Sequence, residues 1–196
     1  MAAKREIAPE DIMAPEDYAA RRSELRARIT ELKRDRRIAV GPDAMFYFES
    51  YDTMWHQVHE MLHVEKGGAE QVPGELAAYN PLIPKGEELV ATVMFEIADP
   101  ARRERVLAGL GGVEETFSIT VAGAAITGVA EQDVDRTNSA GKASSVQFVH
   151  FPFTPDQIAA FRSGDGDVVV GVGHPNYAHM AVMPDAARAA LALDFT

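Results

Sequence analysis

Three of the six histidines in the chain lie close to a glutamate in a spacing that suits metal chemistry. His56, His59 and His63 follow one another at helical intervals, and His59, Glu60 and His63 form the pattern H-E-x-x-H. On a helix, the two imidazoles of this pattern lie one turn apart and can bind one zinc ion, with the glutamate beside the metal-bound water. One hypothesis is therefore a zinc-dependent hydrolase with His59 and His63 as ligands and Glu60 as general base.

Residues 49–65, which carry this pattern, are predicted to form one amphipathic helix. At about 100° per residue, the apolar side chains fall on one face. These are Tyr51, Met54, Trp55, Val58, Met61 and Leu62. The polar side chains of Glu49, Asp52, His56, His59, Glu60 and His63 fall on the opposite face. A polar face of this kind is often simply solvated, so a functional role for Glu60 requires another part of the chain to cover it.

The zinc-hydrolase hypothesis lacks a marked third ligand. His56 is seven residues from His63, about 10.5 Å along a helix, which is too far for both to join His59 on one ion. Residues 64–69 do not continue the pattern toward a third histidine. The E-x-x-H of di-iron bundles also needs a second copy and two more glutamates, and the sequence contains one copy.

A second group of histidines follows a predicted strand in residues 171–179. If His174 approaches the amphipathic helix, then Glu49, Glu60 and His174 would form a mixed carboxylate and imidazole site suited to iron, manganese or zinc. The alternative is that His174 begins a turn with Pro175 and bonds to the backbone.

Together these patterns define the candidate site residues. The candidate metal ligands are Glu49, His59, Glu60, His63 and His174, and Glu60 is also the candidate catalytic residue. A divalent transition metal, zinc, iron or manganese, is the possible cofactor. No nucleotide cofactor is indicated, because there is no P-loop and residues 171–173 are too short for a dinucleotide fingerprint.

Composition favours an ordinary soluble protein. The chain has 196 residues and no cysteine, so thiolate metal sites and disulfides are excluded. No apolar run approaches the roughly 18 residues of a membrane span, and the N-terminus lacks the apolar stretch of a signal peptide. We expect a cytoplasmic protein without membrane contact. The net charge of −11 makes nucleic-acid binding unlikely and leaves a protein partner or a homo-oligomer as the expected association.

Residues 15–36 are predicted to form a long helix with unusual charge. Eight basic residues stand against three acidic ones between positions 21 and 37. The apolar stripe is narrow, so the arginines should face solvent or dock onto the acidic remainder of the chain. Binding of phosphate or RNA is the less favoured interpretation.

The remaining segments predict an α+β fold. Strands are expected at 37–40, 44–49, 88–97, 115–122, 124–134, 144–153 and 167–172, and further helices at 74–79, 101–110, 155–162 and 185–193. We expect a mainly antiparallel sheet with the long N-terminal helix and the histidine-rich helix packed on it. We expect residues 1–196 to form a single domain, with an N-terminal helical arm at 1–36 and an α+β body at 37–196.

Several short motifs resemble one bacterial family, domain of unknown function 3501. They are Lys4-Arg-Glu-Ile7, Leu32-Lys-Arg-Asp-Arg-Arg37, Phe46-Tyr-Phe-Glu49, Glu60-Met-Leu62, Ala78-Tyr-Asn-Pro-Leu-Ile-Pro84, Leu107-Ala-Gly-Leu-Gly-Gly112 and His174-Pro-Asn-Tyr177. The resemblance covers nearly the whole chain and brings no established activity. It implies a redox or oxidative-stress setting, because genes of this family occur near rubrerythrin-like, iron–sulfur and flavin-linked oxidoreductase genes. It also includes Glu60 in a family motif.

Three hypotheses about function follow. The first is a His and carboxylate metal-binding or small-ligand-binding protein that acts with redox or oxidative-stress partners. The second is a non-catalytic accessory or scaffold protein for an oxidoreductase complex. The third is a metal-dependent enzyme, of which the zinc-dependent hydrolase using residues 59–63 is one form.

Overall fold

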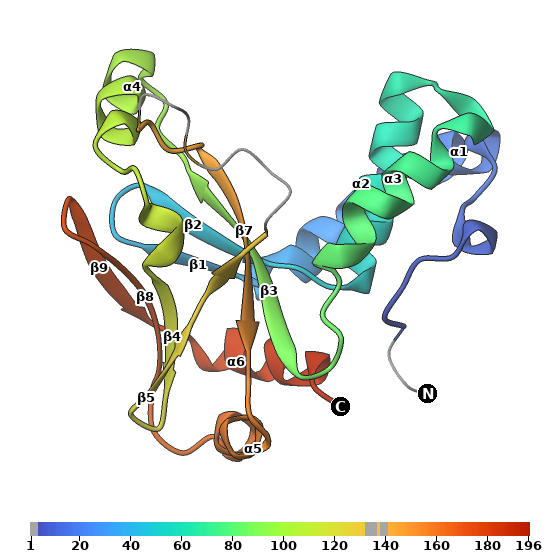
Figure 1. Ribbon diagram of the computed structural model, residues 1–196. Coiled ribbons are helices and arrows are strands. Elements are labelled where there is room, and N and C mark those ends of the chain that lie inside the picture. Colours follow the sequence, from blue (N-terminus) through green and yellow to red (C-terminus); the bar gives the residue numbers. More distant parts are fainter. Residues whose placement is uncertain (1–3, 132–136, 138–140) are drawn as a thin grey trace.

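Two antiparallel β-sheets pack face to face, and an arm of three helices lies at one side of them (Figure 1). The structure is a computed structural model that describes residues 4–131, 137 and 141–196. The predicted α+β class is confirmed. The strands form two sheets where the sequence predicted one.

Every strand pairing within the two sheets is antiparallel. The five-stranded sheet has the order β1 (Arg37–Val40), β2 (Ala44–Phe48), β3 (Glu88–Phe95), β7 (Val146–Pro152) and β6 (Val129–Ala130). The four-stranded sheet has the order β5 (Ala124–Thr127), β4 (Phe117–Val121), β8 (Val168–His174) and β9 (Tyr177–Val182). Strand β3 lies in the middle of its sheet, as its apolar sequence predicted.

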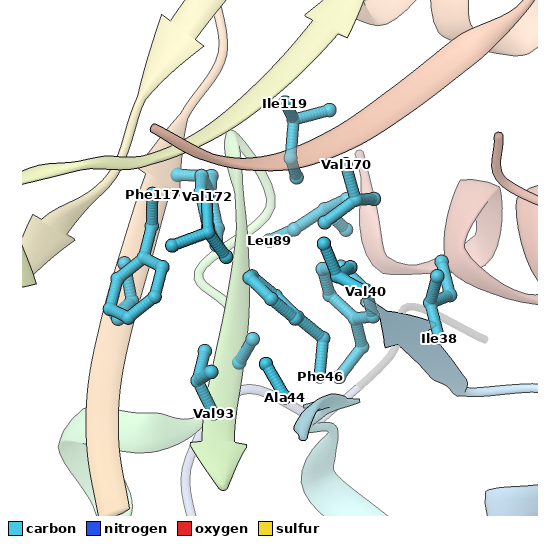
Figure 2. Close-up of a cluster of buried hydrophobic side chains, with 14 of the residues drawn as sticks. Ile38, Val40, Ala44, Phe46, Leu89, Val93, Phe117, Ile119, Val170 and Val172 are labelled. Atoms are coloured by element: carbon cyan, nitrogen blue, oxygen red, sulfur yellow. The ribbon is translucent and has the colours of Figure 1, made fainter. Parts of the chain in front are cut away.

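The main core fills the space between the two sheets. In β2 and β4 alternate residues point inward, so both strands bury every second side chain. Phe46 from the first sheet meets Phe117 from the second edge to face, with ring centroids 5.6 Å apart (Figure 2). This alternation fixes the register of both sheets, because a slip by one residue would turn the apolar side chains outward.

The stretch predicted as one strand at 124–134 is divided between the sheets. Strand β5 pairs with β4, and after Gly128 the chain enters β6 and pairs with β7. A Cβ atom on Gly128 would lie 2.6 Å from Cγ1 of Val149, so no side chain fits there. The break at Gly128 is therefore a corner at which one extended segment passes from one sheet to the other. Residues 132–134 of this prediction lie outside the described residues.

Strand β9 was not predicted from the sequence. It forms a hairpin with β8 across the turn at Pro175 and Asn176. The hydroxyl of Tyr177 on β9 donates to the carbonyl of Val40 at 2.8 Å and accepts from the backbone N–H groups of Asp43 and Ala44 at 2.8 Å. Tyr177 thereby fastens the turn between β1 and β2 to the second sheet.

The arm is formed by α1 (Pro15–Arg34), α2 (Tyr51–Glu65) and α3 (Val72–Tyr79), with the 3-10 turn η1 (Pro9–Asp11) before α1 and η2 (Gly68–Glu70) before α3. It has its own apolar core, in which Met54 and Val58 of α2 contact Leu76 and Val90. Val90 lies on β3, so the arm rests on the outer face of the five-stranded sheet. The predicted division at residue 36 separates α1 from α2, whereas in the structure these two helices pack together.

The remaining helices border the sheets. They are α4 (Pro100–Ala108), α5 (Pro155–Ser163) and α6 (Asp185–Leu191), with the 3-10 turns η3 (Asn80–Leu82), η4 (Val113–Glu115) and η5 (Ala192–Asp194). Asp99 and Thr154 cap α4 and α5. Arg102 on α4 binds the carboxylate of Asp43 through both terminal nitrogens at 2.7 Å.

Across the described part of the chain, no helix combines the length and apolar character that crossing a membrane requires.

Candidate functional site

The polar face of α2 is covered by α1, as a role for Glu60 required. Tyr18 and Arg22, one turn apart on α1, both reach Glu60. Nε and Nη2 of Arg22 donate to the two carboxylate oxygens at 2.8 Å each, and the hydroxyl of Tyr18 donates to Oε1 at 2.7 Å. Arg22 thus docks onto the acidic body, which was the favoured interpretation for the basic helix.

Glu60 is held as a carboxylate. The hydrogen bonds from the Arg22 guanidinium lower the pKa of Glu60 to about 2, and the Tyr18 hydroxyl adds to this effect. A general base works best with a pKa near the working pH and needs a lone pair directed at the substrate. Three donors already occupy the Glu60 oxygens. This geometry favours a clamp between α1 and α2 over the predicted catalytic base.

His59 has both ring nitrogens engaged within the protein. Nδ1 lies 2.7 Å from the carbonyl of Trp55, and Nε2 accepts the backbone N–H of Met13 at 3.0 Å. The ring is therefore neutral, with its proton on Nδ1 donated to Trp55. Burial lowers the pKa of His59, which favours the same neutral form. The predicted role of His59 as a metal ligand does not fit this arrangement, because neither nitrogen has a free lone pair.

Glu49 is separated from the clamp and buried at the base of α2. Its two carboxylate oxygens accept from the hydroxyls of Thr53 at 2.6 Å and Thr92 at 2.7 Å. Thr92 lies on β3, so Glu49 ties the start of α2 to the five-stranded sheet. The predicted pairing of Glu49 with Glu60 in one metal site therefore does not fit, because each carboxylate has its own set of donors.

His174 bonds to the backbone at a turn, which was the alternative interpretation for it. Nδ1 accepts the N–H of Asn176 at 3.2 Å, and Nε2 lies 3.3 Å from the carbonyl of Gly111. His174 ends β8 in the four-stranded sheet, whereas Glu49 and Glu60 belong to the arm and its base. Over residues 4–131, 137 and 141–196, no three His, Asp or Glu side chains are arranged to hold a metal ion.

His63 is a predicted ligand that lines an open site and whose ring nitrogens have no hydrogen-bond partner among the described residues. It lines a groove of about 850 Å³, hereafter the arm groove, between η1, α2 and α3. The walls are largely apolar. They are formed mainly by Ile12, Met13, Leu62, Val72, Pro73 and Leu76. Tyr18 and His59 form the buried floor, and Lys66 stands with His63 at the end of α2.

The arm groove exists because the segment before α1 folds back over α2. Asn80 accepts the N–H of Ile7 at 2.8 Å and donates to its carbonyl at 3.0 Å. Nε1 of Trp55 donates to the carbonyl of Asp11 at 2.9 Å. With the bond from Met13 to His59, these contacts hold residues 7–13 against α2 and α3. Sequence reasoning missed the groove because it depends on contacts between segments far apart in the chain.

Two comparisons with known proteins found matches. A family model described as protein of unknown function DUF3501 matches residues 6–195. The chain belongs to the DUF3501 family. It is also similar to the crystal structure of a novel protein of unknown function from Burkholderia pseudomallei K96243, with a TM-score of 0.90 and 31% sequence identity. That match covers 97% of this chain and 99% of the other. A comparison with curated proteins found no match.

The motifs that carry the DUF3501 resemblance form structural anchors in this chain. Arg5 donates to the carbonyls of Pro84 and Asp194, which joins the first motif to the proline-rich loop and to the C-terminus. Asn176 donates to the carbonyl of Gly109 at 2.8 Å, which joins the last motif to the glycine-rich loop after α4. These contacts hold segments that are far apart in the chain against one another.

Proposed function

We propose that this protein binds one small, largely apolar molecule in the arm groove. The observation that supports this proposal is the groove itself, which has a volume of about 850 Å³ and predominantly apolar walls. This size lies within the range of roughly 300–1,000 Å³ that is usual for small-molecule sites. The proposal retains the small-ligand part of the first sequence hypothesis and leaves out its metal site.

The groove is built to keep its shape without a ligand. The rings of Trp55 and His59 contact each other at a tilt of 41° with centroids 4.0 Å apart, and the ring centroids of His59 and Tyr18 lie 4.9 Å apart. Hydrogen bonds hold each of these three rings. A floor with fixed rings reduces the entropy that binding would otherwise cost. This preorganisation supports binding of a compact ligand.

Binding is favoured over catalysis by the groups around the groove. His59 is committed to Trp55 and Met13, and Glu60 is committed to Arg22 and Tyr18. The hydroxyl of Tyr18 lines the groove and lies 3.2 Å from Nδ1 of His56, but its proton is donated to Glu60. Burial raises the pKa of Tyr18, so its hydroxyl stays protonated and is not an activated nucleophile. The chemistry that remains is recognition by apolar contact and by two basic groups.

The single tryptophan gives a direct test. Trp55 lies against the floor of the groove, so it can transfer excitation energy to a neutral apolar fluorophore such as N-phenyl-1-naphthylamine bound there. Ala69→Phe fills the groove, and Ala77→Phe makes the same change at an exposed site on α3 outside it. We expect Ala69→Phe to weaken probe binding at least about tenfold and Ala77→Phe to leave it unchanged. No saturable binding by the unmodified protein, or equal binding by both variants, would overturn the proposal.

An association of two copies is the second candidate, and the outer face of the four-stranded sheet favours it. The strand register places ten residues on this face: Ser118, Thr120, Ala125, Thr127, Val169, Gly171, Gly173, Ala178, Met180 and Val182. None is charged, on a chain of net charge −11. Two copies can meet here without bringing like charges together, which suits a two-fold contact of the same face with itself. We propose a homodimer through this face.

Light scattering coupled to size-exclusion chromatography tests the dimer. Ala125→Glu places a charge on the uncharged face, and Ala77→Glu places the same charge on α3. We expect a dimer for the unmodified protein and for Ala77→Glu, and a monomer for Ala125→Glu. A monomer at every concentration of the unmodified protein would contradict the proposal. The oxidoreductase partner implied by the family resemblance remains a prediction.

A further inference from the structure

The arm groove differs in charge from the rest of the protein. The chain contains 30 aspartates and glutamates. None of them is among the described residues that line the groove, where the ionisable basic groups are His59, His63 and Lys66. Because His59 is neutral and hydrogen-bonded on both sides, Lys66 and His63 determine the charge that the groove prefers. A negatively charged group is the complementary one.

Lys66 stands in an unfavourable backbone conformation at the end of α2. Its φ of 57° and ψ of 29° lie in the left-handed region, where glycine is usual at the end of a helix. The next residue is Gly67, so a helix longer by one residue would place a glycine in the left-handed position. A lysine at a helix end also interacts favourably with the helix dipole, but a lysine in the preceding turn would do so without this backbone conformation.

The ammonium group of Lys66 is available for a ligand. Lys4 binds Asp11, Lys85 binds backbone carbonyls of Arg5 and Asn80, and Lys142 binds Glu104. Among the residues that the structure describes, Lys33 and Lys66 both lack such a side-chain partner, and of these two Lys66 is the one that lines the arm groove. Lys66 thus combines an unfavourable backbone conformation with a side chain that lines an apolar groove and has no partner there. A ligand that supplies a negatively charged group explains this combination.

His63 lies in the last turn of α2, and Lys66 directly follows the end of this helix. Both side chains line the arm groove. His63 is half-buried, and the centroid of its ring lies 6.0 Å from that of Tyr18. Its nitrogens have no hydrogen-bond partner among the described residues. Lys66 and His63 can therefore donate together to one small anionic head at this end of the groove.

The rest of the groove suits a hydrocarbon tail. Leu62, Val72 and Leu76 form one wall, and Ile12 and Met13 form the other. We infer that the ligand is a free single-chain amphiphile with an apolar tail along these walls and a carboxylate-type monoanionic head at Lys66 and His63. This inference rests on the proposed function, because it assumes that the groove binds a small molecule.

Matched amphiphiles test the head group separately from the groove. Decanoate, decanol and decylammonium share one tail and differ in charge, and each can displace the neutral fluorophore from the unmodified protein. We expect decanoate to bind about tenfold more tightly than decanol, and decylammonium most weakly. Across octanoate, decanoate and dodecanoate, affinity should rise about threefold to fourfold per added methylene.

Variants then locate the head group. Lys66→Gln should remove the preference for decanoate over decanol and leave decanol binding unchanged, and His63→Gln should reduce the preference in part. Lys33→Gln is the matched control, because it removes one lysine charge from α1 outside the groove. Equal affinity for decanoate and decanol, or a preference that survives Lys66→Gln, overturns the anionic ligand and leaves the groove function standing. If neither the fluorophore nor any amphiphile binds, the groove function itself fails.

Discussion

Arg22 on α1 and Glu60 on α2 form a two-point contact in which each guanidinium N–H meets its own carboxylate oxygen at 2.8 Å. Their side chains are 32% and 19% exposed, so the pair is partly shielded from water. Paired bonds of this kind are stronger and more directional than single ones. The contact fixes how α1 lies on α2, and with it the position of Tyr18 at the floor of the arm groove.

Removal of this contact should destabilise the fold. We expect Glu60→Gln to lower the free energy of unfolding by about 1–3 kcal/mol, because the guanidinium of Arg22 loses its charged partner. Urea unfolding measures this change. The control is Glu24→Gln, which removes the exposed partner of Arg21 and should cost about 0.5 kcal/mol or less. If the two variants lose equal stability, the contact between Arg22 and Glu60 stabilises the fold no more than an exposed ion pair does.

Acid should weaken the same contact over a defined pH range. Because the Arg22 hydrogen bonds lower the folded pKa of Glu60 to about 2 from its ordinary 4.5, the carboxylate stabilises the fold above 4.5. That contribution is lost as the pH falls through the folded value. The difference in unfolding free energy between the unmodified protein and Glu60→Gln should therefore shrink from pH 4.5 toward about 2. A difference that stays constant over this range would contradict the assignment.

Opposite pH behaviour is expected at His150 on β7. Nδ1 lies 2.9 Å from Glu88 and Nε2 lies 3.0 Å from Glu131, and the hydrogen bond to Glu88 is the main cause of a raised pKa at His150. A raised folded pKa stabilises the fold fully below the ordinary value of 6.5, and this contribution is lost as the pH rises through the folded value.

Proton NMR of the His150 ring measures this pKa directly. We expect its midpoint above 6.5 in the unmodified protein and a downward shift in Glu88→Gln, which removes the nearer carboxylate. The stability lost in His150→Gln should also be larger at pH 6 than well above the measured midpoint. A midpoint at or below 6.5 would show that burial of the ring outweighs its two carboxylates.

The sequence predicted helices and strands well where the pattern that marks them lies within the element itself. The apolar stripe and the polar face of residues 49–65 predicted α2, and the helices predicted at 101–110 and 155–162 correspond to α4 and α5. Strand β9 was missed because its residues 178–180 and 182 are exposed on both sides, which removes the alternation that marks a half-buried strand. The corner at Gly128 was missed because only the approach of Val149 shows that a side chain cannot fit.

The candidate site was predictable only in its outline. The sequence singled out Glu60 and required that its face be covered, and α1 covers it. It could not name Arg22 as the partner, because the choice among the arginines of α1 depends on how two helices rotate against each other. It also could not show that His59 is neutral, since the N–H of Met13 reaches its ring only after residues 7–13 fold back. The spacing of the histidines therefore predicted a metal ligand at His59, whereas in the structure hydrogen bonds to the backbone occupy both nitrogens of its ring.

Lys66→Gly should separate stability from ligand binding. Glycine adopts the left-handed conformation without the steric cost that a side chain brings, so we expect the free energy of unfolding to rise by about 0.5–1 kcal/mol. The same change removes the ammonium group, so the preference for decanoate over decanol should disappear. Ala122→Gly is the control, because Ala122 also has a positive φ, 48°, in the exposed turn between β4 and β5. It should gain similar stability and keep the preference. If Lys66→Gly instead loses stability, the lysine is retained for the helix end itself and its backbone conformation gives no support to a ligand.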